Sequence, residues 1–106
     1  MDELPTHETF FKHINTKFQA VLDEDNHVDL ELGQVSELTV NPGQQQFSIV
    51  FHGPTEVFLG QGVRILRHEQ MGQFEIFLVP IAQDEKGFHY EAVFNRISAS
   101  TAVAAS

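Results

Sequence analysis

The longest apolar run of the chain lies at residues 73–80 and is rich in β-forming side chains. In a strand, side chains alternate between two faces, which puts Phe74 and Ile76 on one face and Phe77 and Val79 on the other. A strand with one solvated face would be polar on that side, whereas this one is apolar on both sides. We therefore predict a central strand, with the core against one face and further protein covering the other.

Shorter stretches before and after this run also alternate between apolar and polar residues, and they predict further strands. Asn41-Pro42-Gly43 supplies a turn. The strand at 27–32 can continue past Gly33 as residues 34–40, with the glycine marking a bulge or bend. The polar stretch 82–87 predicts a loop. The predicted strands are residues 17–22, 27–32, 47–52, 63–69, 73–80 and 88–97.

The sequence predicts a short helix near the N-terminus. Thr6 is placed to cap a helix, and Glu8 lies in the first turn, where the helix dipole favours an acid. Phe10 and Ile14 share one face, and the segment ends near Asn15. Two turns of helix are not stable alone, so we expect this helix to cover one end or face of the sheet.

Short strands, short connections and one short helix predict an all-β fold. Six or seven antiparallel strands in a meander close most economically into a small barrel or roll, and a β-sandwich is the alternative. One hairpin of this arrangement would pair residues 47–52 with 63–69. Residues 1–97 form the predicted single domain, and the small, featureless residues 98–106 are predicted to be a disordered tail.

Composition narrows the function. The chain of 106 residues holds ten Phe, one Tyr and no Trp, a supply that suits a core better than a binding surface. A net charge of −9 disfavours nucleic acid and anionic membranes as partners. The absence of cysteine excludes disulfides and thiolate metal sites. With neither a signal peptide nor an apolar run long enough for a membrane span, we predict a cytoplasmic protein.

The six histidines raise the question of a metal site. In the predicted hairpin, His52 and His68 lie about five residues, or roughly 17 Å, apart along the strands. A shared metal needs each ligand within about 2.1 Å. His89 falls at the end of the sheet remote from His68, so the histidines are expected to be scattered, and we predict neither a metal site nor a cofactor. The remaining histidines are expected at the surface: His7, His13 and His27.

Catalytic motifs are not found in the sequence. His68 and Glu69 are neighbours on a strand, as are Tyr90 and Glu91, and such neighbours point to opposite faces. Neither a nucleophile elbow nor a glycine-rich phosphate loop is present. We therefore predict that the protein is not an enzyme.

Phe51-His52-Gly53-Pro54 ends a predicted strand in an exposed position and can form the rim of a ligand site. The alternative interpretation is a strand end at which Gly-Pro redirects the chain. Together with the second apolar face of the central strand, this motif gives a candidate binding surface. Its members are His52, Gly53, Pro54, Phe58, His68 and Phe77.

The leading functional hypothesis is a non-enzymatic interaction module. If the short helix does not cover Phe77 and Val79, a protein partner or a second copy of the chain can. A small-molecule-binding barrel is one alternative, although Phe side chains leave little room inside six or seven strands. The other is an enzyme that uses His52 or His68 with an acid such as Glu69.

Several segments also resemble a known family, namely residues 4–10, Phe51-His52-Gly53-Pro54, His68 with Gly72, residues 74–80 and residues 90–95. The family consists of short, stand-alone bacterial proteins classed as a domain of unknown function. The resemblance covers roughly residues 2–95 and implies a small β-rich domain without a transferable activity. It further implies that some relatives are encoded near phage-tail-collar-like proteins, which favours an accessory or assembly role over catalysis.

Overall fold

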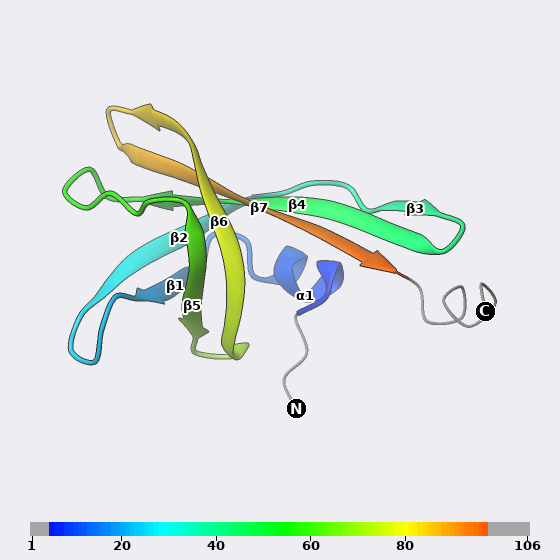
Figure 1. Cartoon of the computed structure of the whole chain (residues 1–106), viewed down its shortest axis with the longest axis horizontal. Coiled ribbons are helices and arrows are strands. Elements are labelled where there is room, and N and C mark those ends of the chain that lie inside the picture. Colours follow the sequence, from blue (N-terminus) through cyan, green and yellow to red (C-terminus); the bar gives the residue numbers. More distant parts are fainter. Residues whose placement is uncertain (1–4, 98–106) are drawn as a thin grey trace.

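The computed structural model of the chain describes residues 5–97. One short helix is followed by seven strands, and six of these close into an antiparallel barrel (Figure 1). The predicted tail, residues 98–106, lies outside the described residues. The elements are α1 (His7–Lys12), β1 (Lys17–Val21), β2 (His27–Val35), β3 (Thr39–Asn41), β4 (Gln44–Gly53), β5 (Gly62–His68), β6 (Gly72–Asp84) and β7 (Gly87–Ile97).

The strands follow the order β2-β1-β5-β6-β7-β4-β3, and a further pairing of β2 with β4 closes the barrel. All neighbouring strands of the described chain pair antiparallel, which confirms the predicted all-β barrel. The predicted hairpin between residues 47–52 and 63–69 is wrong. β4 pairs with β2, β3 and β7, whereas β5 pairs with β1 and β6, because the chain crosses over between β4 and β5 through residues 54–61.

The strand predicted at 73–80 is longer than its apolar run indicated. β6 continues through Pro80 to Asp84, so the loop predicted at 82–87 is wrong except for its central turn between Asp84 and Gly87. The register of β6 against β7 shifts between Pro80 and Ala82. Proline has no amide hydrogen for a ladder, and a bulge is where a sheet accommodates it.

A second irregularity lies at Gly33, where the register of β2 against β4 shifts between Leu32 and Gln34. The predicted bulge or bend at this glycine is therefore confirmed. A Cβ at Gly33 would lie 2.6 Å from Nε2 of His52, so a larger residue there would displace this exposed ring.

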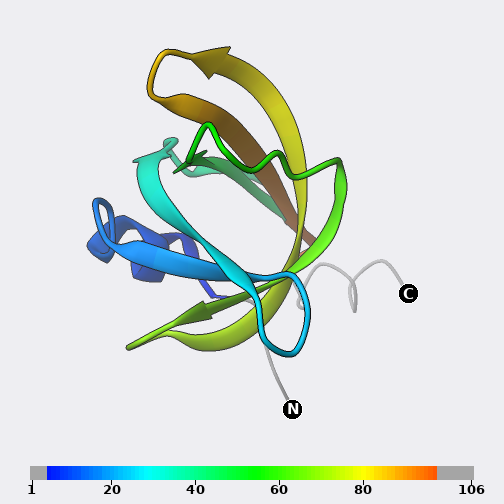
Figure 2. The same cartoon turned by 90° about the vertical axis from the view of Figure 1, so that its left-hand side faces the viewer.

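Alternation along the strands fills the barrel with one apolar core. Aromatic rings occupy much of it, and Tyr90, the largest fully buried side chain, receives a hydrogen bond from the amide of Leu59 at 3.0 Å. Figure 2 shows the strands curving around this interior. The buried core residues are Phe10, Phe18, Ala20, Val28, Leu30, Leu32, Phe47, Ile49, Phe51, Leu59, Leu66, Phe74, Ile76, Leu78, Tyr90, Ala92 and Phe94.

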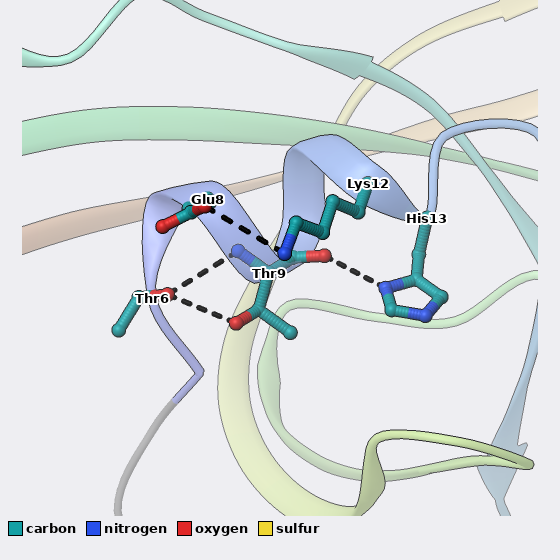
Figure 3. Close-up of polar contacts among 5 residues, drawn as sticks. All are labelled: Thr6, Glu8, Thr9, Lys12 and His13. Atoms are coloured by element: carbon teal, nitrogen blue, oxygen red, sulfur yellow. Dashed lines mark hydrogen bonds and ion pairs between the residues drawn. The ribbon is translucent and has the colours of Figure 1, made fainter.

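The helix begins as predicted, since the hydroxyl of Thr6 accepts a hydrogen bond from the amide of Thr9 at 3.2 Å (Figure 3). Glu8 and Lys12, one turn apart, form an exposed ion pair at 3.6 Å. The helix buries Phe10 completely and leaves Phe11 59% exposed. It therefore seals one end of the barrel through a single large side chain.

Phe10 lies among aromatic rings from four strands. Its ring centroid is 5.3 Å from that of Phe94, 5.7 Å from Phe74, 6.2 Å from Phe47 and 6.5 Å from Phe18. These rings belong to β7, β6, β4 and β1 respectively. One helical residue thus joins strands on opposite sides of the barrel.

Beyond the barrel, β3, the first half of β4 and the end of β7 form a three-stranded arm (Figure 1). The described chain is accordingly elongated, with principal extents of 48 × 29 × 24 Å. His7 packs the helix against this arm. Its ring centroid lies 5.1 Å from that of Phe47, and its Nε2 lies 2.8 Å from the carbonyl oxygen of Ser36. His7 is therefore a packing residue rather than the simple surface residue predicted.

Candidate functional site

The outer face of β6 carries the apolar side chains that the sequence analysis singled out. β6 lies between β5 and β7, which confirms the predicted central position. The predicted cover over its second face is wrong for the described residues, because Phe77 is 49% exposed. The helix contacts the inner face instead, where Phe74 points. The sequence shows that both faces are apolar, but it does not show which of them the helix covers.

Phe77 belongs to an apolar patch that spans three neighbouring strands, defined here as Val63 on β5, Phe77 on β6 and Val93 on β7. Val63 pairs directly with Phe77 across the β5–β6 ladder. Val63 is 63% exposed and Val93 is 59% exposed. Isolated exposed apolar residues are normal, but large ones gathered on one face are typical of contact surfaces, and here Phe77 and Val93 line one groove.

The pairing of β6 with β7 stops beside this patch. The β6–β7 ladder ends at Val79 and Glu91, whereas β6 continues to pair with β5 as far as Gly72 and β7 continues to pair with β4 as far as Ile97. The two strands diverge from this point (Figure 1). The gap between them, residues 72–78 of β6 and 92–97 of β7, is called the seam below.

Acidic side chains border the patch. Glu75 on β6 pairs across the sheet with Ile65, and Glu91 on β7 pairs with Val79, so both acids share the outer face with Phe77. Within residues 5–95, neither acid forms an ion pair. The patch therefore combines exposed apolar area with two acids that form no ion pair, although exposed Arg67 of β5 shares the outer face with Glu75.

The motif at 51–54 lies on another part of the barrel. Phe51 is fully buried, and Gly53 is also buried; an added Cβ at Gly53 would lie 2.9 Å from Cδ2 of Leu30. His52 is exposed, and half-buried Pro54 begins the crossover to β5. Gly-Pro therefore redirects the chain at the strand end, and the side chain of His52 faces solvent.

A groove of about 560 Å³ opens beside this strand end, where β2 runs past the crossover. The predicted rim residues His52, Gly53 and Pro54 line it together with the apolar side chains of Val28 and Val57. Charged and titratable groups of both signs also line it, so it favours no single charge on a ligand. These groups are Lys17, His27, Asp29, Glu31 and Lys86.

His52 and His89 form a pair that the sequence analysis did not predict. They are direct cross-strand partners, and their ring centroids lie 4.3 Å apart. Nε2 of His89 lies 2.9 Å from Oδ2 of Asp84. The amide of Lys86, the imidazole of His89 and the amide of Gly87 donate to the carboxylate of Asp84 and lower its pKa.

This pair does not form a metal site in the described structure. Nε2 of His52 lies over Gly33, whereas Nε2 of His89 lies against Asp84, so the two nitrogens do not converge. Among residues 5–97, no group of three or more potential metal-ligating side chains is close enough to hold an ion.

Phe58 and Phe77 are separated on the barrel. Phe58 lies on the crossover at residues 54–61, is 59% exposed and contacts the edge of Phe88 with ring centroids 5.1 Å apart. The predicted candidate surface therefore divides into a region around His52, Gly53, Pro54 and Phe58, and a separate region around Phe77.

His68 is buried, with 9% of its surface exposed, and it has a structural position. Its Nδ1 accepts hydrogen bonds from the amides of Gln70 and Met71 at 3.0 and 3.2 Å. The proton of the neutral ring is therefore on Nε2, which lies 2.9 Å from the hydroxyl of Thr16 and donates to it. That hydroxyl in turn donates to the carbonyl oxygen of His13 at 2.6 Å.

The histidines thus form two close pairs, and the prediction that they are scattered is wrong. The rings of His13 and His68 pack edge to face with centroids 4.8 Å apart, and His13 is half-buried rather than a plain surface residue. Sequence spacing does not reveal either pair, because each joins residues at least 37 positions apart through a strand or helix contact. The register of the sheet identifies the pair of His52 and His89, and the packing of the helix end on β5 identifies the pair of His13 and His68.

The burial of His68 predicts a pH-dependent stability. Loss of hydration lowers its pKa, and the neighbouring His13 lowers it further. Because the unfolded chain binds the proton more readily, the stabilisation is complete above the ordinary value of about 6.5 and is lost as the pH falls below it. We expect the free energy of unfolding to decrease between pH 7.5 and 5, measured by urea unfolding.

The control for this effect is the exposed His27. His68→Gln should flatten the dependence of the unfolding free energy on pH over this range, whatever its effect on absolute stability, whereas His27→Gln should leave it unchanged. An imidazole titration of His68 by NMR with a midpoint above 6.5 contradicts the assignment.

The fold and its surfaces define a class of protein: a small closed β-barrel, plugged at one end by a helix, with an exposed apolar patch beside an interrupted ladder. Residues 5–94 match the family described as "Domain of unknown function (DUF6916)". The chain belongs to this family, which confirms the predicted resemblance at that level. No curated protein and no solved structure matches the chain. Within residues 5–97, no helix has the length and apolar character needed to cross a membrane.

Proposed function

We propose that the chain is a non-enzymatic interaction module that binds a protein partner through the apolar patch. The observation that carries this proposal is the exposure of Phe77 between Val63 and Val93 on the outer face of the central strand. The burial of large aromatic and aliphatic side chains is the main favourable term in protein association. The sequence resemblance implies that some relatives are encoded near phage-tail-collar-like proteins, which favours an accessory role in assembly as the setting.

Charge indicates the kind of partner. Glu75 and Glu91 border the patch, and the chain as a whole has a net charge of −9. A second copy would bring the same acids and the same net charge to the interface, and like charges across an interface are unfavourable. A partner with lysine or arginine around an apolar centre complements both features.

Two observations favour this proposal over the alternatives from the sequence. Both ring nitrogens of His68 already have protein partners, and the adjacent Glu69 is exposed while His68 is buried, so these two do not form an acid–base pair. The barrel interior is occupied by rings such as Phe18 and Phe51, whose centroids lie 5.2 Å apart. An interior ligand site would require these rings to move.

A photo-crosslinking experiment tests the proposal. We expect p-benzoylphenylalanine in place of Phe77 to give a discrete crosslink to another protein in the native cell. The same substitution at Phe58 is the matched control, because both are phenylalanines about half exposed but in separate regions. A crosslink at Phe58 and none at Phe77 contradicts the proposal. If Phe77 crosslinks only to a second copy of the chain, the proposed basic partner is wrong. Sedimentation of the purified chain would then also show self-association.

A further inference from the structure

We propose that the seam binds an extended peptide segment of the partner as an added β-strand, paired along the free edge of β7. This inference rests on the proposed function, because it specifies how the partner engages the region of the apolar patch. The added strand would take the place that β6 vacates where it diverges from β7. Strand addition to an open sheet edge is a common mode of peptide recognition.

The sequence explains why the edge is open. Pro80 places a bulge in β6 between Pro80 and Ala82, and bulges bend a strand and increase its twist. Two residue pairs further on, after Val79 and Glu91, β6 and β7 no longer pair. Among residues 5–97, β7 from Ala92 onward therefore has a ladder partner on the β4 side only, and its amide and carbonyl groups on the other side pair with no described strand.

The seam is also shaped for side chains. It contains a groove of about 340 Å³ whose floor is formed by three buried residues, Ile76, Ala92 and Phe94. Phe77 and Val93, both exposed, form its two walls. An extended segment directs every second side chain to the same face, so alternate apolar residues would fill this groove while the backbone pairs with β7.

The charge of the groove indicates which peptide segments can bind there. Glu75 and Asn95 line the same groove at its exposed rim. Within residues 5–95, no cation pairs with Glu75. We therefore expect a segment with alternating apolar residues and at least one lysine or arginine near Glu75. A second copy of this acidic chain fits the groove less well than such a basic segment.

The probe is a phage-displayed library of random twelve-residue peptides, selected against the full chain. We expect the enriched peptides to alternate apolar and polar residues and to contain lysine or arginine. Val93→Asp should weaken the best peptide at least tenfold. Val40→Asp should change its affinity less than twofold, because Val40 is equally exposed, at 64%, but lies on β3 outside the seam.

Backbone pairing is tested separately with N-methylated versions of the best peptide. In a strand, alternate amides face the same neighbour, so methylation at one set of alternate positions should abolish binding and methylation at the other set should be tolerated. Equal tolerance of both sets overturns strand addition and leaves docking through side chains. Binding that Val93→Asp does not change places the peptide elsewhere and also overturns the inference.

The remaining outcomes separate this inference from the proposed function. A selection that enriches no peptide, together with a Phe77 crosslink to a partner, overturns strand addition alone. Failure of both the selection and the crosslink overturns both proposals. Self-association of the purified chain that Val93→Asp removes assigns the seam to a second copy and overturns the basic peptide as its occupant.

Discussion

Replacing Phe10 with alanine is expected to lower the free energy of unfolding by about 3–5 kcal/mol, the usual cost of removing a buried phenylalanine. Phe10 has no exposed surface and contacts rings from four strands. The rigid sheet around it cannot collapse fully into the vacated space, so a cavity remains. Total stability of a domain is about 5–15 kcal/mol, which makes this a large fraction. Urea unfolding followed by circular dichroism measures the loss.

Phe11 provides the matched control for Phe10. It is the next residue of the same helix and is 59% exposed, so Phe11→Ala should cost less than about 1 kcal/mol. If the two variants lose similar stability, the helix does not seal the barrel through Phe10. If Phe10→Ala does not fold, Phe10→Leu retains most of the volume and should give a smaller, measurable loss.

Gly87→Ala is expected to be at least as damaging, with a loss of more than about 3 kcal/mol or failure to fold. An added Cβ would lie 1.8 Å from the carbonyl oxygen of Gly53, and φ of Gly87 is +148°, a value that side chains disfavour. The obstacle is backbone, held by the pairing of Gly53 with Phe88, so no side-chain rotation relieves it. Thermal unfolding of the Gly87→Ala variant and of the unchanged chain measures the loss of stability.

Gly72 provides a control that distinguishes backbone strain from a steric clash of the added Cβ. It also has a positive φ, +82°, but a Cβ there would meet nothing within 4 Å. Gly72→Ala should therefore cost only the conformational term, about 1–2 kcal/mol. Similar losses at Gly72 and Gly87 would show that the approach of Gly87 to Gly53 is not what requires glycine there.

The local parts of the fold could be predicted from the sequence because they depend on neighbouring residues. Alternation identified the strands, Thr6 identified the start of the helix, and Gly33 identified a bulge. Pro80 was misleading, because proline more often ends a strand than bends it. Which strands pair was not predictable, since β4 and β5 are consecutive and equally apolar yet have no ladder between them.

The candidate site was predictable to a similar extent. Alternation alone placed Phe77 on a second apolar face, but whether that face is covered depends on where the helix packs. The seam depends on the divergence of β6 from β7, which no local pattern encodes. His68 was predicted as a member of the candidate binding surface, whereas it is buried and has hydrogen-bond partners near residues 16 and 70 that only the folded chain brings together.

The position of Phe10 has a consequence for the order of events during synthesis. The helix is synthesised before all seven strands of the described fold, yet its binding site includes Phe94 on β7. Until translation reaches β7, the N-terminal helix has no complete surface to pack against, and two turns of helix are not stable alone. The helix is therefore made before the strands but becomes ordered after them, and a ribosome stalled before β7 would present a nascent chain with Phe10 still exposed.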